Sequence, residues 1–364
     1  MGAGGVVRLP LVDAGGAAGR LAGTVIVRTP AFLLLCLVIA GAVFAGSLAI
    51  GNDYVFFAGY VILQYVVLST AWNILGGYCG YVNFGTGAFF ALGAYSTVAI
   101  YKMVGDSELP HIIPIPVLML IGGVVSGVVG LGMGYLTLRL RGAFFSIATL
   151  ALAVVLETLV VNWDYVGGSR GAYVIRPEEM PLIGNYIRYL FLMMMLLSVA
   201  SIAIARLIER SRLGYGFATI RDDELAAEAL GVPTLRLKLI ATTLSGALMG
   251  MAGAPFPYYI GYLQPDSTFG LDYAVNSIAM PLIGGTTSWV GPLIGTLLLG
   301  TLQQVATVTI SSAVNLLLVG VLLVVFVIVA PNGIVGLVHS YLQRKPEEFV
   351  GRRHVDADAP GSVP

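Results

Sequence analysis

The sequence has few charged residues: Lys, Arg, Asp and Glu make up 10% of its 364 residues, whereas 57% are hydrophobic. Soluble domains carry roughly 25% charged residues, so this chain could not cover the surface of a soluble fold. The mean hydropathy of +0.90 instead indicates an integral membrane protein. Because the formal net charge is zero, the composition points to no nucleic-acid partner.

Cysteine, histidine and lysine are also scarce. The two cysteines, Cys36 and Cys79, lie in apolar stretches, as small buried side chains do, and they provide no disulfide framework. The three histidines are scattered, so no metal site is predicted. No lysine follows a glycine, which excludes the Gly-Lys pair of a phosphate-binding loop. We therefore predict no catalytic residue, no metal and no cofactor bound by this chain, and we do not expect an enzyme.

Long apolar runs and 47 glycines are what the sequence has in abundance. A helix rises about 1.5 Å per residue, so about 20 apolar residues cross a bilayer, and glycine suits close helix contacts. We predict an all-α, polytopic membrane bundle of about ten transmembrane helices with Gly-broken segments, the eighth helix being short. The expected spans are 31–50, 54–75, 81–101, 115–138, 143–161, 189–207, 238–258, 272–287, 291–310 and 313–330.

The domain organisation follows from these runs. Residues 1–30 are expected to form a flexible cytoplasmic extension, 31–340 the transmembrane domain, and 341–364 a cytoplasmic tail. The first run is longer than the 7–15 residues of a signal-peptide core, so we interpret it as a retained helix, with a cleaved signal as the alternative. Alternating the loops puts most of the 19 Lys and Arg residues on the side of both termini, which predicts cytoplasmic termini.

Two uncharged Gly-rich stretches, 76–87 and 281–292, interrupt membrane-length runs. Irregular backbone is tolerated at membrane depth where it is buried in protein or lines a cavity, and such breaks often mark a transport pathway. Two tight helix–helix turns are the alternative. The candidate pathway residues are Asn83, Phe84, Gly85, Thr86, Gly284, Gly285 and Thr286.

Ionisable residues are sparse inside the predicted spans. The clear case is Glu157, near the end of the fifth span, and we expect it to bond to polar neighbours. Proton- or sodium-coupled transporters usually need more ionisable groups within the membrane. The sequence therefore favours a pathway whose driving energy comes from elsewhere.

The loop 208–237 is the most hydrophilic part of the chain. Gly214 and Gly216 allow a turn, Gly231 and Pro233 stop a helix, and the residues between predict one helix of about four turns. Its charges are net acidic, whereas helices that lie on lipid favour Lys and Arg, so docking to a protein is favoured over a membrane surface. A solvated connecting helix is the alternative. Arg221 and Glu224 could pair at i,i+3, and an apolar face is expected from Phe217, Ile220, Ala227 and Leu230.

Several stretches, in order over residues 54–340, resemble permease subunits of ABC importers for branched-chain amino acids. Residues 212–232 resemble the cytoplasmic coupling loop of that family. Thr86 departs from the family, which often has His or Gln at that point, and Pro281 also varies a motif. The other matching stretches are 83–95, 140–150, 167–171, 283–295 and 331–336.

The resemblance implies a transmembrane permease subunit that moves branched-chain or similar hydrophobic amino acids across the cytoplasmic (inner) membrane by alternating access. It also implies a second homologous permease, two cytoplasmic ABC ATPases that use ATP and Mg, an extracytoplasmic substrate-binding protein, and contact with membrane lipid. The alternatives are the same family importing urea, short amides or other amino acids, and a stand-alone secondary transporter or channel. The expected ATPase-coupling residues are Arg212, Gly214, Arg221, Asp222, Asp223, Glu224, Glu228 and Gly231.

Overall fold

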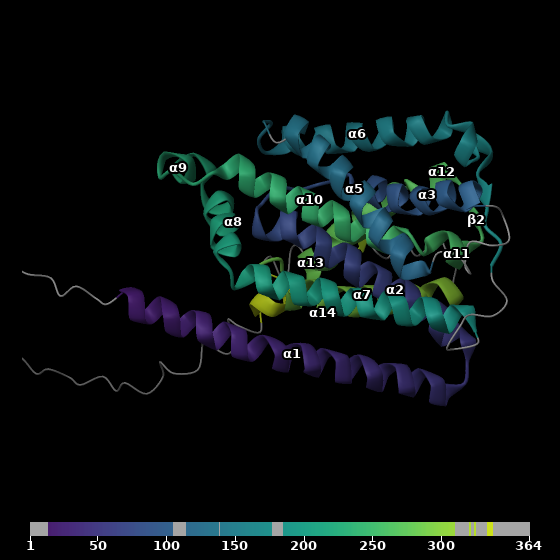
Figure 1. Cartoon of the computed structure of the whole chain (residues 1–364), viewed down its shortest axis with the longest axis horizontal. Coiled ribbons are helices and arrows are strands. Elements are labelled where there is room, and N and C mark those ends of the chain that lie inside the picture. The colour runs from purple at the N-terminus through teal and green to yellow at the C-terminus, as the bar shows by residue number, and fades with distance from the viewer. Residues whose placement is uncertain are drawn as a thin grey trace, which may run out of the picture.

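The computed structural model describes residues 14–104, 114–137, 139–176, 185–309, 320–321, 324 and 333–337, with side chains from residue 30 onward. It is a bundle of long helices (Figure 1). Within this described part, eight helices are long and apolar enough to cross a membrane, which confirms the predicted helical membrane architecture. These spans are Pro30–Ile50, Asp53–Tyr78, Thr86–Val104, Ile115–Thr137, Ala143–Val161, Tyr186–Glu209, Thr234–Ile260 and Val290–Thr307.

The eight spans match the first seven and the ninth of the predicted ten. The predicted eighth span is α13 (Leu271–Gly284), which has only 14 residues and is therefore about 21 Å long, shorter than a bilayer core. The predicted tenth span, 313–330, lies almost wholly outside the described residues, and so does the predicted tail 341–364.

Helix α1 (Ala14–Ile50) runs along the edge of the bundle, whereas α2 (Asp53–Asn73) lies inside it (Figure 1). The side chain of Asn52 caps α2 by accepting a hydrogen bond from the Tyr54 amide at 2.9 Å. Helix α2 packs against α7 (Tyr186–Glu209) and α14 (Val290–Thr309). Its last turn passes into the π-helical turn η1 (Ile74–Tyr78).

Glycine allows the central helices α3 (Thr86–Val104), α5 (Ile115–Thr137) and α10 (Thr234–Gly253) to touch backbone to backbone. A side chain at Gly93 would collide with the carbonyl of Gly250, and one at Gly250 would collide with Ser126. Among the described helices, α10 and α5 share the most extensive contact. These small residues therefore decide which helices form the centre of the bundle.

The two ends of the bundle differ. At one end, β1 (Ala172–Tyr173) pairs antiparallel with β2 (Tyr262–Leu263), Ala172 opposite Leu263. We call this the sheet end; it also holds the short helices η2 (Asp164–Val166), η3 (Gly168–Arg170), α11 (Phe256–Ile260) and α12 (Pro265–Thr268). Helices α8 (Arg212–Asp222) and α9 (Glu224–Ala229) form the opposite end. Helix α6 (Ala143–Val161), on the outside of the bundle, buries little of its surface.

Candidate functional site

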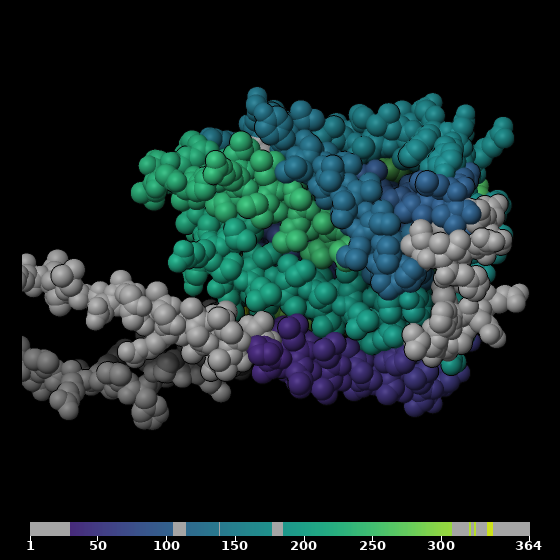
Figure 2. Space-filling model, in the orientation of Figure 1, coloured from purple at the N-terminus to yellow at the C-terminus, as the bar shows by residue number. Residues whose placement is uncertain are grey.

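Helices α8 and α9 connect α7 to α10 and lie at one end of the bundle (Figures 1 and 2). Ser211 starts α8, because its hydroxyl accepts hydrogen bonds from the amides of Leu213 and Gly214 at 3.2 and 3.4 Å. A side chain at Gly214 would collide with the carbonyl of Ile208. Gly214, a predicted coupling residue, thus allows the sharp turn from α7 into α8.

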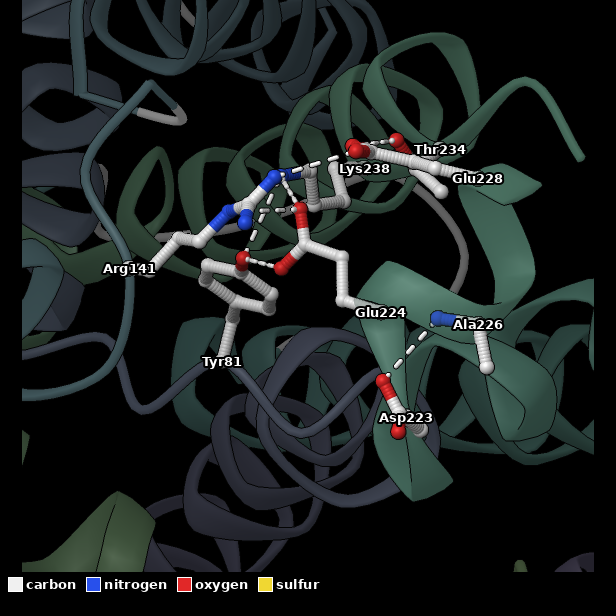
Figure 3. A network of polar contacts seen from close by, with 8 residues as sticks. All are labelled: Tyr81, Arg141, Asp223, Glu224, Ala226, Glu228, Thr234 and Lys238. Carbon is white, nitrogen blue, oxygen red and sulfur yellow. Dashed lines mark hydrogen bonds and ion pairs between the residues drawn. The ribbon is translucent and has the colours of Figure 1, made fainter.

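The prediction of one continuous helix in this loop is wrong. Asp223 has extended backbone angles, φ −158° and ψ 107°, which end α8 and begin α9. Its carboxylate accepts a hydrogen bond from the Ala226 amide at 3.0 Å (Figure 3). Aspartate is among the preferred N-cap residues because it satisfies amides that have no partner within the helix. Asp223 therefore breaks the helix and turns α9 away from α8.

The predicted apolar face of the loop is buried at three of its four positions. Phe217, Ile220 and Ala227 pack against the bundle, each at most 3% exposed. Leu230 does not, because it lies after the end of α9 and is 84% exposed. Gly231 follows it with a positive φ of 83°, a conformation that favours glycine and ends a helix.

Glu224 lies at the centre of a polar network that ties the loop to the bundle (Figure 3). Its carboxylate accepts a hydrogen bond from Nζ of Lys238, in α10, at 2.7 Å, and another from the Tyr81 hydroxyl. Nε of Arg141, just before α6, lies 3.6 Å from the same carboxylate. The Glu224 side chain is 13% exposed and that of Lys238 is 3% exposed. Glu224 therefore faces the bundle and not a partner.

Glu228 extends this network by one turn of α9. Its carboxylate pairs with Arg141 at 3.1 Å and accepts a hydrogen bond from the Thr234 hydroxyl, at the start of α10, at 2.9 Å. Arg141 thus binds two carboxylates of the loop. The network joins α9 to α10, to the connection between α5 and α6, and to the irregular segment between η1 and α3 that contains Tyr81.

The electrostatics of the network favour an ionised Glu224. Burial alone would raise the pKa of its carboxyl group, but the hydrogen bonds from Lys238 and Tyr81 and the charges of Lys238 and Arg141 bring it below its ordinary value. Burial and the hydrogen bond to Glu224 raise the pKa of Tyr81, which stays a neutral donor. The ion pair between Glu224 and Lys238 is therefore the resting state at neutral pH.

Arg221 does not form the predicted pair with Glu224. Its guanidinium contacts Asp222 at 3.4 Å and donates a hydrogen bond to the carbonyl of Gly77 at 3.5 Å. The break at Asp223 turns α9 away from α8, so the two residues no longer occupy successive turns of one helix. Arg221 instead connects α8 to the first Gly-rich stretch.

The outward side of the loop is what remains for contact with another molecule. We call the exposed side chains of Asp222, Leu225 and Leu230 the tip surface; Asp222 has a 73% exposed side chain and Leu225 is 64% exposed. Arg212, Asp223 and Gly231 are also exposed. Among the predicted coupling residues, Glu224 faces the bundle, whereas Arg221 and Glu228 are exposed but still contact other segments of the chain. The remaining exposed coupling residues are Arg212, Asp222, Asp223 and Gly231.

The first group of predicted pathway residues lies in buried irregular backbone. Between η1 and α3 the chain has no regular secondary structure, and Asn83, Gly85 and Thr86 are buried. The Asn83 side chain accepts a hydrogen bond from the Gly85 amide at 2.7 Å. The backbone carbonyl of Asn83 accepts another from Nε1 of Trp72 at 2.9 Å. Phe84 is partly exposed. Protein groups thus satisfy this backbone, as membrane depth requires.

The second group, Gly284, Gly285 and Thr286, forms a tight turn between α13 and α14. A side chain at Gly284 would collide with the carbonyl of Gly291, and Gly285 has a positive φ of 120°. The second Gly-rich stretch is therefore a tight helix–helix turn, which was the alternative to a pathway segment. The carbonyl of Thr286 abuts Gly77, so the two Gly-rich stretches meet there.

Sequence reasoning missed four residues that hold this end of the bundle together. Tyr81, Arg141 and Lys238 complete the network around Glu224. Glu209, at the end of α7, accepts hydrogen bonds from the Trp289 amide at 2.9 Å and the Tyr78 hydroxyl at 3.5 Å. One signal was available for Lys238: a lysine inside an apolar helix needs a carboxylate partner, and the nearest hydrophilic segment is acidic.

A known protein family matches this chain over most of its length. The family model described as the permease component of branched-chain amino acid transport systems covers residues 54–327. The chain belongs to this family. The matched residues include the whole loop of α8 and α9 and seven of the eight long helices in the described part of the permease.

Individual relatives resemble the permease at modest identity. The high-affinity branched-chain amino acid transport system permease protein LivM of Salmonella typhimurium is 26% identical, over 90% of this chain and 80% of its own length. The probable branched-chain amino acid transport permease protein LivH of Methanocaldococcus jannaschii is 25% identical, over 72% and 85%. The ribose import permease protein RbsC of Haemophilus influenzae is 23% identical, over 69% and 76%. No solved structure matches the chain significantly.

Proposed function

We propose that the chain is the membrane-spanning permease subunit of an ATP-driven importer of branched-chain or similar hydrophobic amino acids. Two features support this: membership of the permease family and a loop that is tied inward by ion pairs while it exposes leucines outward. The described part of the chain forms no cluster of metal-binding side chains, and the sequence has no phosphate-binding loop. In this proposal the energy comes from a separate ATPase.

The anchored loop is the observation that carries the proposal. An ATPase that docks on the tip surface and moves during ATP hydrolysis pulls α8 and α9 with it. Because Glu224 is bound to Lys238, and Glu228 to Arg141, this movement passes to α10 and to the connection between α5 and α6. A bias of a few kcal/mol between two conformations is enough to switch which side of the pathway is open.

The remaining parts of the importer follow from this arrangement. The α8–α9 end faces the cytoplasm, together with both termini, and each of two ATPases contacts one permease. A second homologous permease completes the pathway. The sheet end then faces the extracytoplasmic side of the inner membrane, where the substrate-binding protein delivers its amino acid.

Reconstitution in liposomes tests the proposal. We expect the complex purified with its partner ATPases and binding protein to take up radiolabelled leucine only when ATP is supplied on the cytoplasmic side. The chain alone is expected to give no uptake. ATP-independent uptake by the chain alone would mean a stand-alone transporter or channel and would overturn the proposal.

One relative supports a second candidate substrate class. Because the ribose import permease RbsC aligns over most of this chain, the same architecture accommodates an importer for a different small solute. Competition of leucine uptake by isoleucine, valine, ribose, urea and acetamide separates these cases. We expect only the aliphatic amino acids to compete; competition by ribose or urea alone would reassign the substrate.

A further inference from the structure

A cavity of about 320 Å³ lies between α3, α6, α12 and α13. Its volume is at the lower end of the range of small-molecule sites, about 300–1,000 Å³. Leu150, Phe269 and Leu271 line it together with Phe84, which was predicted to lie on the pathway. The cavity adjoins α12, at the sheet end, so it lies away from the α8–α9 loop.

Two carboxylates, Glu157 of α6 and Asp266 of α12, line the same cavity. Neither forms a hydrogen bond or an ion pair with any described residue, so the polar neighbours predicted for Glu157 are not found. A carboxylate in a membrane helix is costly when it has no partner, and it commonly marks a site for a ligand. Of the two, Glu157 lies in the membrane helix α6 and is partly exposed, whereas Asp266 lies in the short helix α12 and is exposed. Together the two carboxylates that line this cavity match a cationic group of a ligand.

The first turn of α3 brings the opposite polarity to the cavity. Gly87 and Ala88 line it, and the first amides of a helix have no acceptor within the helix and carry a partial positive charge. The first turn of α3 itself contains no acidic residue. Thr86, the first residue of α3, is fully buried and does not line the cavity; its hydroxyl has no hydrogen-bond partner in the described part of the chain. A helix end of this kind binds carboxylates and phosphates.

The larger cavity between α1, α2, α7 and α14, of about 510 Å³, differs in chemistry. Its walls are almost entirely apolar, and none of its lining residues is a lysine, arginine, aspartate or glutamate. It therefore offers no group that would hold an ionic ligand. The cavity at α3 differs from this larger one because it has carboxylates on one side and the amides of a helix N-terminus on the other.

We propose that the cavity between α3, α6, α12 and α13 is a binding site for a zwitterionic α-amino acid with an aliphatic side chain. Glu157 and Asp266 hold the ammonium group, and the amides at the first turn of α3 hold the carboxylate. Phe84, Leu150 and Phe269 pack around the side chain. This site rests on the proposed function and adds to it a place on this chain where the solute is recognised.

Uptake by the reconstituted complex provides the first test. We expect Glu157→Gln with Asp266→Asn to raise the KM for leucine by about tenfold or more, because an ammonium group loses its charged partners. Glu157→Asp retains the negative charge, so we expect its KM for leucine to stay close to that of the wild type. Asp164→Asn, an exposed carboxylate of η2 outside the cavity, is the matched control and leaves KM unchanged.

Crosslinking provides the second test. A leucine analogue with a diazirine side chain is irradiated with the wild-type complex, and the labelled peptides are identified by mass spectrometry. We expect label on residues 84–88 or 150–157, and we expect excess leucine to remove it. Two analogues should leave the label in place: 2-hydroxy-4-methylpentanoate, which lacks the ammonium group, and 3-methylbutylamine, which lacks the carboxylate. The double variant is expected to lose this label.

The outcomes separate the two proposals. If the wild-type complex transports leucine but the double variant keeps its KM and its crosslinks, the binding site is wrong and the transport function stands. If the label appears only elsewhere on the chain, the site is likewise wrong. If the wild-type complex transports no amino acid, the proposed function fails and the site fails with it.

Discussion

At the scale of single residues, Lys238 is the side chain on which the anchoring of the loop depends. It lies within the apolar helix α10, is 2% exposed and contacts both Glu224 and Tyr81. Its ammonium group also lies 4.7 Å from the centre of the Tyr81 ring, where a cation is attracted to the aromatic face. A buried lysine is tolerated only with such partners.

We expect Lys238→Met to lower the stability of the chain by up to about 3 kcal/mol, because it leaves the Glu224 carboxylate half of a broken buried pair. Adding Glu224→Gln should cost little more, since the two residues act as one unit. Thermal unfolding of the detergent-purified protein measures both effects. Lys102→Met, at an exposed lysine, is the control, and equal destabilisation by the two lysine variants would contradict the prediction.

The same pair predicts a pH dependence. The pKa of Glu224 is lower in the folded protein than its ordinary value of 4.5, so its contribution to stability is complete above about pH 4.5 and is lost as the pH falls through the lowered value. We expect the melting temperature to fall less between pH 6 and pH 3.5 in Glu224→Gln than in the wild type. Parallel curves for the two proteins would show that Glu224 does not titrate in this range.

At the scale of elements, helices that touch at glycines organise the bundle. The contact of α10 with α3 and α5 depends on positions where any side chain would meet backbone, such as Gly93 and Gly250. In a bilayer, apolar side chains gain little by moving from lipid to protein, so close packing of small residues drives helix association. Substitutions at these contacts should act sterically.

We expect Gly250→Ala to destabilise the bundle by about 1–3 kcal/mol, because the added methyl group overpacks the contact between α10 and α5. Gly132, in α5, has no atom within 4 Å of an added Cβ, so Gly132→Ala is the matched control and should be neutral or slightly stabilising. Thermal unfolding compares the two. Equal melting temperatures would mean that the α10–α5 contact relaxes without cost.

The element between α7 and α10 shows how one residue changes the geometry of a segment. The apolar periodicity of the sequence continues through Asp223 and predicted a single helix. Because Asp223 caps α9 at this point, the loop has two short helices instead of one. This break separates Arg221 from Glu224 and directs the two side chains to different parts of the bundle. A local capping preference therefore decided the arrangement of the predicted coupling residues.

At the scale of the whole molecule, the proposed functions lie at opposite ends. The tip surface and its ion pairs are at one end, and the cavity with Glu157 and Asp266 adjoins the short helices of the other. Helices α3, α6 and α10 extend between them. A movement imposed on the loop can therefore reach the cavity through helices that pack against one another.

We expect Leu225→Ser with Leu230→Ser to weaken binding of the partner ATPase by at least about tenfold, because each exposed leucine loses the gain from being buried in a contact. Affinity is measured with the purified permease in nanodiscs. Leu120→Ser, which changes an exposed leucine of α5, is the control and should bind normally. Undiminished binding by the double variant would place the docking surface elsewhere.

Sequence reasoning was most successful for the helical spans and least successful for side-chain pairing. Apolar length alone identified eight described helices, because the bilayer sets the length of a span. The partners of Glu224 could not be found in this way, because Tyr81 and Arg141 come from distant segments, and Lys238, although only 14 residues away, lies inside the next span. Leu230 was misplaced because the predicted periodicity ran past the end of α9.

The sequence by itself determined that this chain is a helical membrane protein of the permease family, with a hydrophilic acidic loop between two spans. Hydropathy and glycine content act along the chain and need no tertiary contact. Only the tertiary structure decided that Glu224 turns inward to Lys238, that the two Gly-rich stretches meet at Gly77, and that Glu157 and Asp266 share one cavity. These contacts depend on how the helices pack around their glycines, and packing between distant segments leaves no periodic signal in the sequence.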